Sequence, residues 1–286
     1  MGLSRLKVDF IGLGEMKSGT SWIANALSQH PGVSLSFPKE LHYFNEKSAY
    51  YNPQKEKYHT DLKGYASHFS HSGRDQIKGE FSVHYLFDPR AAERIKRHFP
   101  ECKLIICTRD PVERAFSQWV WSVYHKHQEK RSFEAVMEEE TELVERGLYY
   151  KNLAVYLDHF PSDQILILSL DAIKKEPLET LSKIARFLAI DSFPEHLNLN
   201  KSNSAKSTKS QLLYKMERFV GDNLHKIGLS GLGNTVRKSG LGKRLNKFNS
   251  KKSDLPVFRS EYHSKYDAIF EEDQRKLKDY LQRQLG

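Results

Sequence analysis

Two segments of this sequence place anion-binding residue types at the point where an apolar strand passes into a helix. The first, residues 12–22, reads Gly-Leu-Gly-Glu-Met-Lys-Ser-Gly-Thr-Ser-Trp and follows an apolar run at residues 8–11. Backbone amides exposed at such a helix start, together with a lysine, form a cradle for a phosphate group. Lys17 precedes the glycine, whereas a nucleotide-triphosphatase loop ends in Gly-Lys-Ser/Thr. An ordinary strand–turn–helix connection is the competing interpretation of this segment alone.

The second segment, residues 107–119, again follows an apolar strand and opens a helix, here at Pro111. Arg109 stands at the carboxyl end of the strand, which is the edge where open α/β sheets bind their ligands. A guanidinium fork matches the geometry of a phosphate better than a point charge does. A capping ion pair between Arg109 and Asp110 is the structural alternative, but it does not explain a second anion site beside the first.

Together the two segments resemble the family of sulfotransferases that use 3′-phosphoadenosine-5′-phosphosulfate (PAPS), most closely its heparan-sulfate-type branch and the bacterial relatives of that branch. Lys-Ser-Gly-Thr-Ser-Trp is similar to the family's 5′-phosphosulfate loop, and Arg-Asp-Pro-x-Glu-Arg-x-x-Ser is similar to its 3′-phosphate site. Weaker matches extend the resemblance from about Phe10 to Ser210. The resemblance implies PAPS as co-substrate and the following nucleotide-binding residues: Lys17, Ser18, Gly19, Thr20, Ser21, Trp22, Arg109, Ser117, Tyr149, Lys206 and Lys209.

Three of these residues lie outside the two segments. Tyr149, after Gly147 and Leu148, is a candidate for stacking beside the adenine. Lys206 and Lys209 occupy the place of a late basic phosphate-binding loop in relatives and would close over the nucleotide. A solvated Ser/Lys linker explains that stretch equally well.

The catalytic residues follow from a third similar stretch, residues 38–44, Pro-Lys-Glu-Leu-His-Tyr-Phe. It is similar to the family's Glu-x-x-Phe-Phe, whose glutamate is the proposed general base, and the resemblance assigns that role to Glu40. Sulfuryl transfer needs such a group, because the attacking acceptor loses a proton. His42 is the competing base, as in cytosolic steroid and phenol sulfotransferases. Lys17 would neutralise charge on the bridging oxygen as the leaving group departs.

Residues 79–85, Gly-Glu-Phe-Ser-Val-His-Tyr, are similar to the family's Glu-Lys-Ser/Thr segment but depart from it once. Phe81 stands where the glycan-modifying branch has a lysine that supports catalysis and acceptor binding. The departure weakens the case for a highly sulfated glycan acceptor. Glu80 would either orient the substrate or take part in a structural ion pair.

The elements that must position these residues alternate between strands and helices. Strands are expected at residues 8–11, 33–37, 103–107 and 164–168. Helices are expected at residues 22–27, 88–99, from 111, from 132, and at 148–160, 177–188, 206–223 and 262–285, and residues 45–75 are expected to form a surface excursion. The alternation predicts an α/β fold, a central parallel sheet flanked by helices, and the resemblance implies the P-loop-like nucleotide-binding sulfotransferase fold.

Charge is concentrated in one place. The chain of 286 residues carries a formal net charge of +9, and residues 223–253 hold basic residues but no acidic one. We expect a single sulfotransferase domain over 1–286, with 227–256 as a mobile basic insert or lid. A nucleic-acid-binding module built on 223–253 is one alternative, although Phe248 is its only aromatic residue. A small-molecule kinase is the other, against which stand the lysine order and the lack of a magnesium-binding aspartate after a strand.

Two cysteines occur, Cys102 and Cys107, and five residues along a strand place them on opposite faces. We therefore expect free thiols and a reducing, cytoplasmic setting. No apolar run reaches the length of a membrane span, the start of the chain has no signal-peptide pattern, and the histidines show no metal-ligand spacing. The expected partner is a small-molecule or glycan acceptor, a hydroxyl or an amine, and no nucleic acid or metal. Lipid, polyketide and phenol acceptors, association with a membrane surface and the oligomeric state stay open.

Overall fold

The computed structural model describes residues 6–45, 62–125, 129–199, 207–208, 250–251 and 255–284. The chain divides into two compact units, one of residues 1–115, 140–203 and 260–286 and the other of residues 116–139 and 204–259. Lys206, Lys209 and most of the stretches 206–223 and 227–256 lie outside the described residues. Their described part includes a short antiparallel pair, β6 (Ser207–Thr208) with β7 (Ser250–Lys251).

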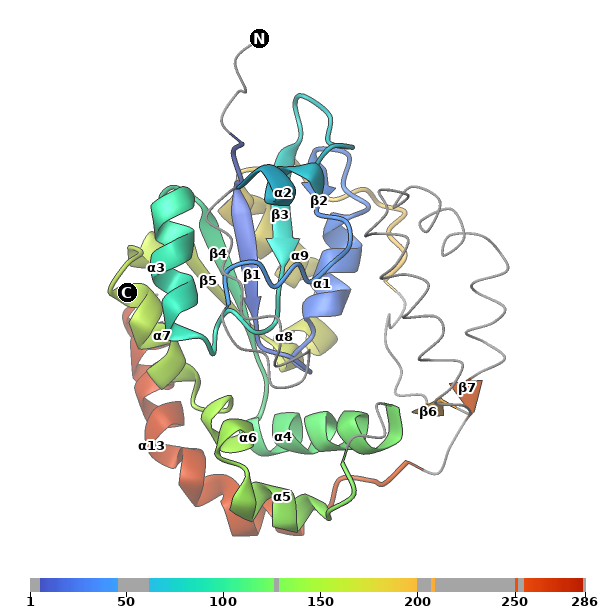
Figure 1. Cartoon of the computed structure of the whole chain (residues 1–286), viewed down its shortest axis with the longest axis vertical. Helices are drawn as coiled ribbons and strands as arrows, with labels where there is room; N and C mark the ends of the chain where they lie inside the picture. The colour runs from blue at the N-terminus through green and yellow to red at the C-terminus, as the bar shows by residue number, and fades with distance from the viewer. Residues whose placement is uncertain are drawn as a thin grey trace. The chain divides into compact units, whose positions relative to one another are not determined.

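The first unit is built on a five-stranded sheet in the order β2-β3-β1-β4-β5, and all neighbouring strands are parallel. The strands, drawn as arrows in Figure 1, are β1 (Phe10–Gly14), β2 (Val33–Leu35), β3 (Ile77–Phe81), β4 (Lys103–Thr108) and β5 (Ile165–Ser169). The expected central parallel sheet is confirmed. β3 escapes prediction because Lys78 and Glu80 break up its apolar residues.

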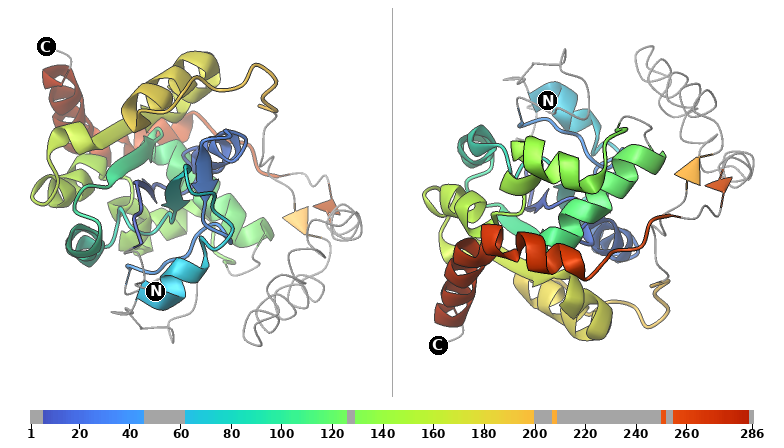
Figure 2. Two further views of the ribbon diagram at one scale, coloured as in Figure 1. Left: turned by 90° about the horizontal axis from the view of Figure 1, so that it is seen from above. Right: turned by 90° about the horizontal axis from the view of Figure 1, so that it is seen from below.

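Helices cover both faces of this sheet, as Figures 1 and 2 show. One face packs against α2 (Leu62–Ser67), α3 (Pro89–His98), α7 (Tyr149–Leu157) and α13 (Glu261–Arg283). The other face packs against α1 (Thr20–Leu27), α8 (Leu170–Lys175) and α9 (Pro177–Leu188). Side chains of a strand alternate between faces, so Ile11 and Leu13 of β1 enter the first core and Phe10 enters the second. Two short helices complete the unit, α6 (Thr141–Glu145) and the 3-10 turn η2 (Ser162–Gln164).

Two helices of this unit begin at carboxylates that accept from their first backbone N–H groups. Asp88 precedes Pro89 at the start of α3 and accepts a hydrogen bond from the backbone N–H of Arg90 at 3.0 Å. At α7 the cap comes from another helix, because the carboxylate of Asp273 on α13 accepts from the backbone N–H groups of Tyr150 (2.9 Å) and Lys151 (2.8 Å). This contact joins α13, the last described helix, to the start of α7.

Residues 45–75 are not purely the surface excursion that the sequence suggests. α2 places Tyr65 in the core with 0% exposure, and Phe69 follows it into the same core. Two aromatic residues four apart are one helical turn, too short a pattern to predict a helix. Residues 46–61 lie outside the described part of the chain.

Cys102 and Cys107 are free and buried, and each lies in a different one of the two cores. This confirms the expected free thiols on opposite faces of the sheet. Among the described helices, none is both long and apolar enough to cross a membrane.

The second unit has a small aromatic core of its own. α4 (Pro111–Val120) begins in the first unit and ends in the second, where the π-helical turn η1 (Trp121–His125) and α5 (Phe133–Glu139) follow. The ring of Phe116 lies 5.3–5.5 Å, between centroids, from those of Trp119, Phe133 and Phe258. Trp119 also donates from its indole nitrogen to the carbonyl of Arg131 at 3.1 Å.

Candidate active site

The loop between β1 and α1 has the form of an anion site. Gly19, at the N-cap of α1, has φ 99°, a left-handed conformation that favours glycine. No side chain caps the helix start and no acidic residue lies in its first turn. The amide groups of this turn are therefore available to a negatively charged ligand, which the positive end of the helix also favours.

Two cations lie at this loop. Arg109, at the end of β4, donates from Nη1 to the backbone carbonyl of Lys17 at 3.3 Å. Burial, followed by the charge of Arg109, lowers the pKa of Lys17 to about 8. The structure thus brings together Lys17 and Arg109, which the sequence assigned to the two phosphate groups of one nucleotide.

Arg109 is held by further contacts. Its guanidinium donates to Oε2 of Glu113 at 2.8 Å, and its backbone N–H donates to the hydroxyl of Tyr149 at 3.3 Å. The ion pair of Arg109 is therefore with Glu113 and not with Asp110. Asp110 accepts from the backbone N–H of Glu113 at 2.7 Å and caps α4. A phosphate at Arg109 would compete with one partly exposed carboxylate.

A buried ion-pair network lies next to the phosphate loop. Arg146 donates to Oε1 of Glu15 at 2.9 Å and to Oε1 of Glu142 at 2.9 Å, and it also hydrogen-bonds Nδ1 of His84. Its guanidinium stacks over the ring of Phe87, 4.7 Å from the centroid. Burial alone would lower the pKa of Arg146, but Glu15 and Glu142 more than offset this and raise it.

The loop that carries Glu40 lies across the end of β3. The backbone N–H of Glu40 donates to the carbonyl of Phe81 at 2.9 Å. The Glu40 carboxylate lies 2.6 Å from Nζ of Lys39 and 3.5 Å from Nε2 of His42. Burial would raise the pKa of Glu40, but the hydrogen bond with His42 and the charge of Lys39 lower it to about 2. Glu40 is therefore ionised at neutral pH.

The two loops are connected through histidines. The ring of His42 meets the ring of His84 edge to face, 4.9 Å between centroids, and His84 contacts Arg146. Because Arg146 binds Glu15 of the phosphate loop, an unbroken series of contacts runs from Glu40 to that loop.

Backbone strain gathers at the same residues. Four described non-glycine residues have positive φ, and three of them are Lys17 (65°), Glu40 (68°) and His42 (50°). The fourth, Ala189, terminates α9. Such conformations are unfavourable for side-chain-bearing residues and cluster at functional sites. The strain singles out the three residues that the sequence proposes as catalytic.

The other predicted site residues have varied surroundings. Ser18 and Thr20 are buried in the phosphate loop, and the indole of Trp22 donates to the carbonyl of Leu199 at 3.3 Å. Tyr149 is 1% exposed and lies in the core, where burial raises its pKa to about 12. This favours a role in holding Arg109 over stacking on a base. Ser117 belongs to the second unit, whereas Arg109 belongs to the first.

Four further residues of this region escape prediction: Glu15, Arg146, Ser82 and Tyr85. Glu15 and Arg146 are 131 positions apart, and nothing local marks either as a partner of the other. Ser82 and Tyr85 stand in the stretch similar to the family's Glu-Lys-Ser/Thr segment, and that similarity is the one signal by which the sequence could have identified them.

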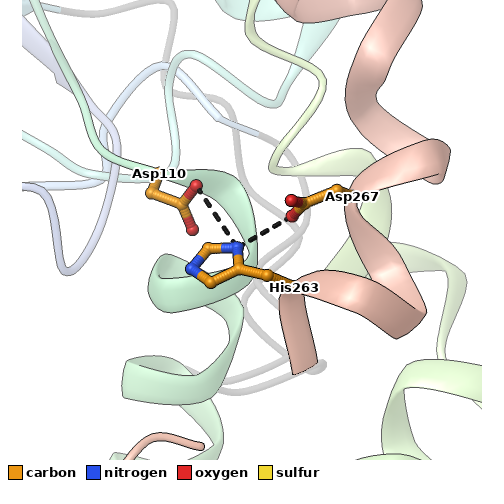
Figure 3. Close-up of side chains that lie close together, drawn as sticks. All are labelled: Asp110, His263 and Asp267. Atoms are coloured by element: carbon orange, nitrogen blue, oxygen red, sulfur yellow. Dashed lines mark hydrogen bonds and ion pairs between the residues drawn. The ribbon is translucent and has the colours of Figure 1, made fainter. Parts of the chain in front are cut away.

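A cluster on α13 lies beside the Arg109 segment. Nδ1 of His263 bonds Oδ1 of Asp267 at 2.8 Å and lies 4.0 Å from Oδ2 of Asp110, as Figure 3 shows. The three ligand atoms lie within 4.8 Å of one another, close enough to hold a metal ion. The hydrogen bond with Asp267 raises the pKa of His263 despite partial burial, which favours a protonated histidine between two carboxylates.

Known sulfotransferases are similar to this chain in sequence. The sequence model of the sulfotransferase domain matches residues 8–279. The chain is 32% identical over 145 residues to the membrane-associated sulfotransferase kil1 of Dictyostelium discoideum, covering 48% of this chain and 29% of that protein. It is 28% identical over 187 residues to heparan sulfate glucosamine 3-O-sulfotransferase 3B1 of Mus musculus, covering 62% and 45%. It therefore spans less than half the length of either relative.

A solved sulfotransferase from Alicyclobacillus acidocaldarius has a similar fold, with a TM-score of 0.60 at 24% identity, over 80% of this chain and 96% of that one. This likeness concerns the fold, which agrees with the parallel sheet and its two helical layers. Because the family match extends over nearly the whole sequence, the chain belongs to the sulfotransferase domain family.

Proposed function

We propose that this protein transfers a sulfuryl group from PAPS to a hydroxyl or amine of an acceptor, with Glu40 as the general base. The observation that carries the proposal is the meeting of Lys17 and Arg109 at the uncapped start of α1. Two cations on neighbouring strand ends fit a nucleotide with two separate phosphate groups. PAPS supplies the activated sulfuryl group, attached to phosphate through a bridging oxygen.

Each residue of the phosphate loop then has a defined task. The amides of Ser18 to Ser21 and the hydroxyls of Thr20 and Ser21 hold the 5′-phosphate. Arg109 holds the 3′-phosphate and exchanges Glu113 for it. Lys17, mostly protonated at pH 7 with a pKa of about 8, stabilises the negative charge that develops on the bridging oxygen.

Glu40 and His42 handle the proton. The acceptor oxygen or nitrogen forms a bond to sulfur as the bond from sulfur to the bridging oxygen breaks, and Glu40 takes the proton that the acceptor loses. His42, 3.5 Å away, orients the carboxylate. In the alternative, His42 is the base and Glu40 orients it; both arrangements use the same pair.

The relatives and the catalytic loop both bear on the acceptor class that we propose. The mouse relative is named for a heparan sulfate glucosamine, which supports a glycan acceptor. Phe81, however, is 1% exposed and fills the space above Gly12, so that strand position offers no cation. The cation at this loop is Lys39, which binds Glu40. A hydroxyl of a glycan that carries few sulfate groups fits this site best.

Several broader expectations remain part of the proposal. A single functional domain over 1–286 is supported by the family match, which spans residues 8–279. The basic stretch 227–256 as its insert or lid stays a prediction, since most of it lies outside the described residues. A reducing, cytoplasmic setting is supported by the buried free thiols. Association with a membrane surface stays open, and one relative is named as membrane-associated.

Transfer of labelled sulfate tests the proposal directly. PAPS labelled at sulfur is mixed with the protein and a fractionated pool of glycans and small molecules. We expect a labelled product, and its loss with Lys17→Ala. Turnover of ATP with magnesium, and none of PAPS with any fraction, would contradict the proposal in favour of a kinase.

A further inference from the structure

Glu80 is a carboxylate with no exposure at all, and it is held by hydroxyl groups. Its carboxylate accepts from the hydroxyls of Tyr65 at 2.8 Å, Ser82 at 2.9 Å and Tyr85 at 3.0 Å. In the described part of the chain no lysine or arginine forms a salt bridge with it. The two roles suggested by the sequence, contact with substrate and an ion pair, do not fit these surroundings.

Two of the three hydroxyls continue to the catalytic loop. Oγ of Ser82 accepts from the backbone N–H of His42 at 3.0 Å. The hydroxyl of Tyr85 accepts from the backbone N–H of Tyr43 at 2.8 Å and of Phe44 at 3.3 Å. Three successive backbone groups of the loop are therefore bound through Ser82 and Tyr85.

The direction of these bonds depends on Glu80. A hydroxyl has one hydrogen to donate and two lone pairs to accept with. Backbone N–H groups only donate, so Ser82 and Tyr85 must accept from the loop and send their own hydrogens elsewhere. Both hydrogens point to Glu80, and an ionised carboxylate accepts without donating. A protonated carboxyl or an amide at this position would have a hydrogen of its own to donate. It would therefore compete with the donation from the hydroxyls of Ser82 and Tyr85.

We propose that Glu80 is a positioning residue for catalysis: it orients the hydroxyls of Ser82 and Tyr85, which hold the backbone that presents Glu40 and His42. The inference rests on the proposed function, because it assigns the catalytic proton to that loop. Backbone with the φ values of Glu40 and His42 persists where surrounding bonds over-determine it. The carbonyl of Phe44 is fixed as well, by Nη1 of Arg94 at 2.9 Å.

The two tyrosines provide a matched pair of variants. Tyr65 and Tyr85 are both fully buried, and both donate to Oε1 of Glu80. The hydroxyl of Tyr65 ends at Glu80, whereas that of Tyr85 also binds the loop. Tyr85→Phe and Tyr65→Phe therefore remove the same group at similar burial, and one of them alone disconnects Tyr43 and Phe44.

We expect Tyr85→Phe to lower kcat of sulfuryl transfer about tenfold to a hundredfold, with the Kd of adenosine 3′,5′-bisphosphate changed less than about twofold. Tyr65→Phe should lower kcat by less than about threefold. Equal losses of kcat in the two variants would overturn the proposal, as would a rise in Kd that matches the loss of kcat. If Tyr85→Phe does not fold, Ser82→Ala carries the same test, and Ser82→Thr, which keeps the hydroxyl, should restore kcat.

Amide hydrogen exchange separates this inference from the proposed function. In Tyr85→Phe the amides of Tyr43 and Phe44 should exchange at least about tenfold faster than in Tyr65→Phe, since they lose a partner in one variant alone. This readout requires no substrate. If the wild type transfers no sulfate but the exchange difference is found, the proposed function fails and the positioning of the loop stands. Equal exchange in the two variants overturns the inference even in an active enzyme.

Discussion

Two fully buried glutamates, one in the phosphate loop and one beneath the catalytic loop, have partners of opposite kinds. Glu15, in the phosphate loop, is paired with the guanidinium of Arg146, and the two side chains are 0% and 1% exposed. Glu80, beneath the catalytic loop, is held by the hydroxyls of Tyr65, Ser82 and Tyr85. Burial raises the pKa of Glu80, and the three hydroxyls counteract this by favouring its charged form.

The difference teaches how each loop is supported. A buried ion pair fails badly when one partner is removed, because the other charge stays buried and uncompensated. Its loss should appear as lost stability. A carboxylate that directs hydroxyls acts through bond direction, so its loss should appear as a misplaced loop and lower turnover. Mutations beside the phosphate loop and in the catalytic loop should therefore affect different measurements.

The largest effect is expected at the catalytic loop itself. Glu40→Gln keeps the shape of the side chain and removes the proton acceptor, so kcat should fall by about 10²–10⁴. The Kd of adenosine 3′,5′-bisphosphate should stay nearly unchanged, because Glu40 faces Lys39 and His42 rather than the nucleotide cations. Steady-state kinetics with His42→Ala as the comparison variant checks this. A larger loss in His42→Ala would assign the base to His42.

The next largest effect should be on stability, at Arg146. Arg146→Ala leaves Glu15 and Glu142 without their cation and removes the stacking on Phe87, so unfolding should cost about 3–5 kcal/mol less. Denaturant unfolding measures the change. Lys151→Ala is the control, since its exposed ion pair with Glu145 at 3.4 Å should contribute under about 1 kcal/mol. A similarly small loss of unfolding free energy in both variants would mean that the buried ion pair does not stabilise the phosphate loop, and the contrast with the catalytic loop would fail.

The phosphate loop was largely readable from sequence, and the network beside it was not. Lys17, Gly19 and the start of α1 are consecutive in the chain, so their residue types reveal strand, turn and helix directly. Arg146 binds Glu15 across 131 positions in the sequence. The stability that this ion pair contributes depends on its burial, which no local pattern encodes. The same reason hid β3, whose alternating polar residue Glu80 points into the core instead of into solvent. Buried polar groups break the apolar pattern on which strand prediction depends.

Nucleotide binding should test the assignment of Arg109 to the 3′-phosphate. Adenosine 3′,5′-bisphosphate at a hundredfold over its Kd should stabilise the protein by about 2.7 kcal/mol. Adenosine 5′-phosphate at the same concentration should stabilise it much less, because Arg109 then keeps Glu113 as its partner. Thermal unfolding with each nucleotide measures the difference, and Arg109→Ala should abolish it. Equal shifts with both nucleotides in the wild type would refute the 3′-phosphate assignment.

The smallest effect tests partly exposed charges, at His263. The hydrogen bond with Asp267 raises the pKa of this half-exposed histidine above its value of about 6.5 in the unfolded chain. A raised histidine pKa means that the folded state holds the proton more tightly, so the stabilisation is complete below pH 6.5 and disappears as pH rises through the folded pKa. Solvent screens the pair, so its contribution is small. The free energy of unfolding of the wild type should exceed that of His263→Gln by about 0.5 kcal/mol at pH 5.5, and the two should be equal at pH 9. Unfolding of both proteins at the two pH values measures this. An equal difference at both pH values would mean that packing, and not charge, holds α13 at Asp110. If zinc at pH 9 raises the free energy of unfolding of the wild type but not of His263→Gln, the cluster is a metal site instead.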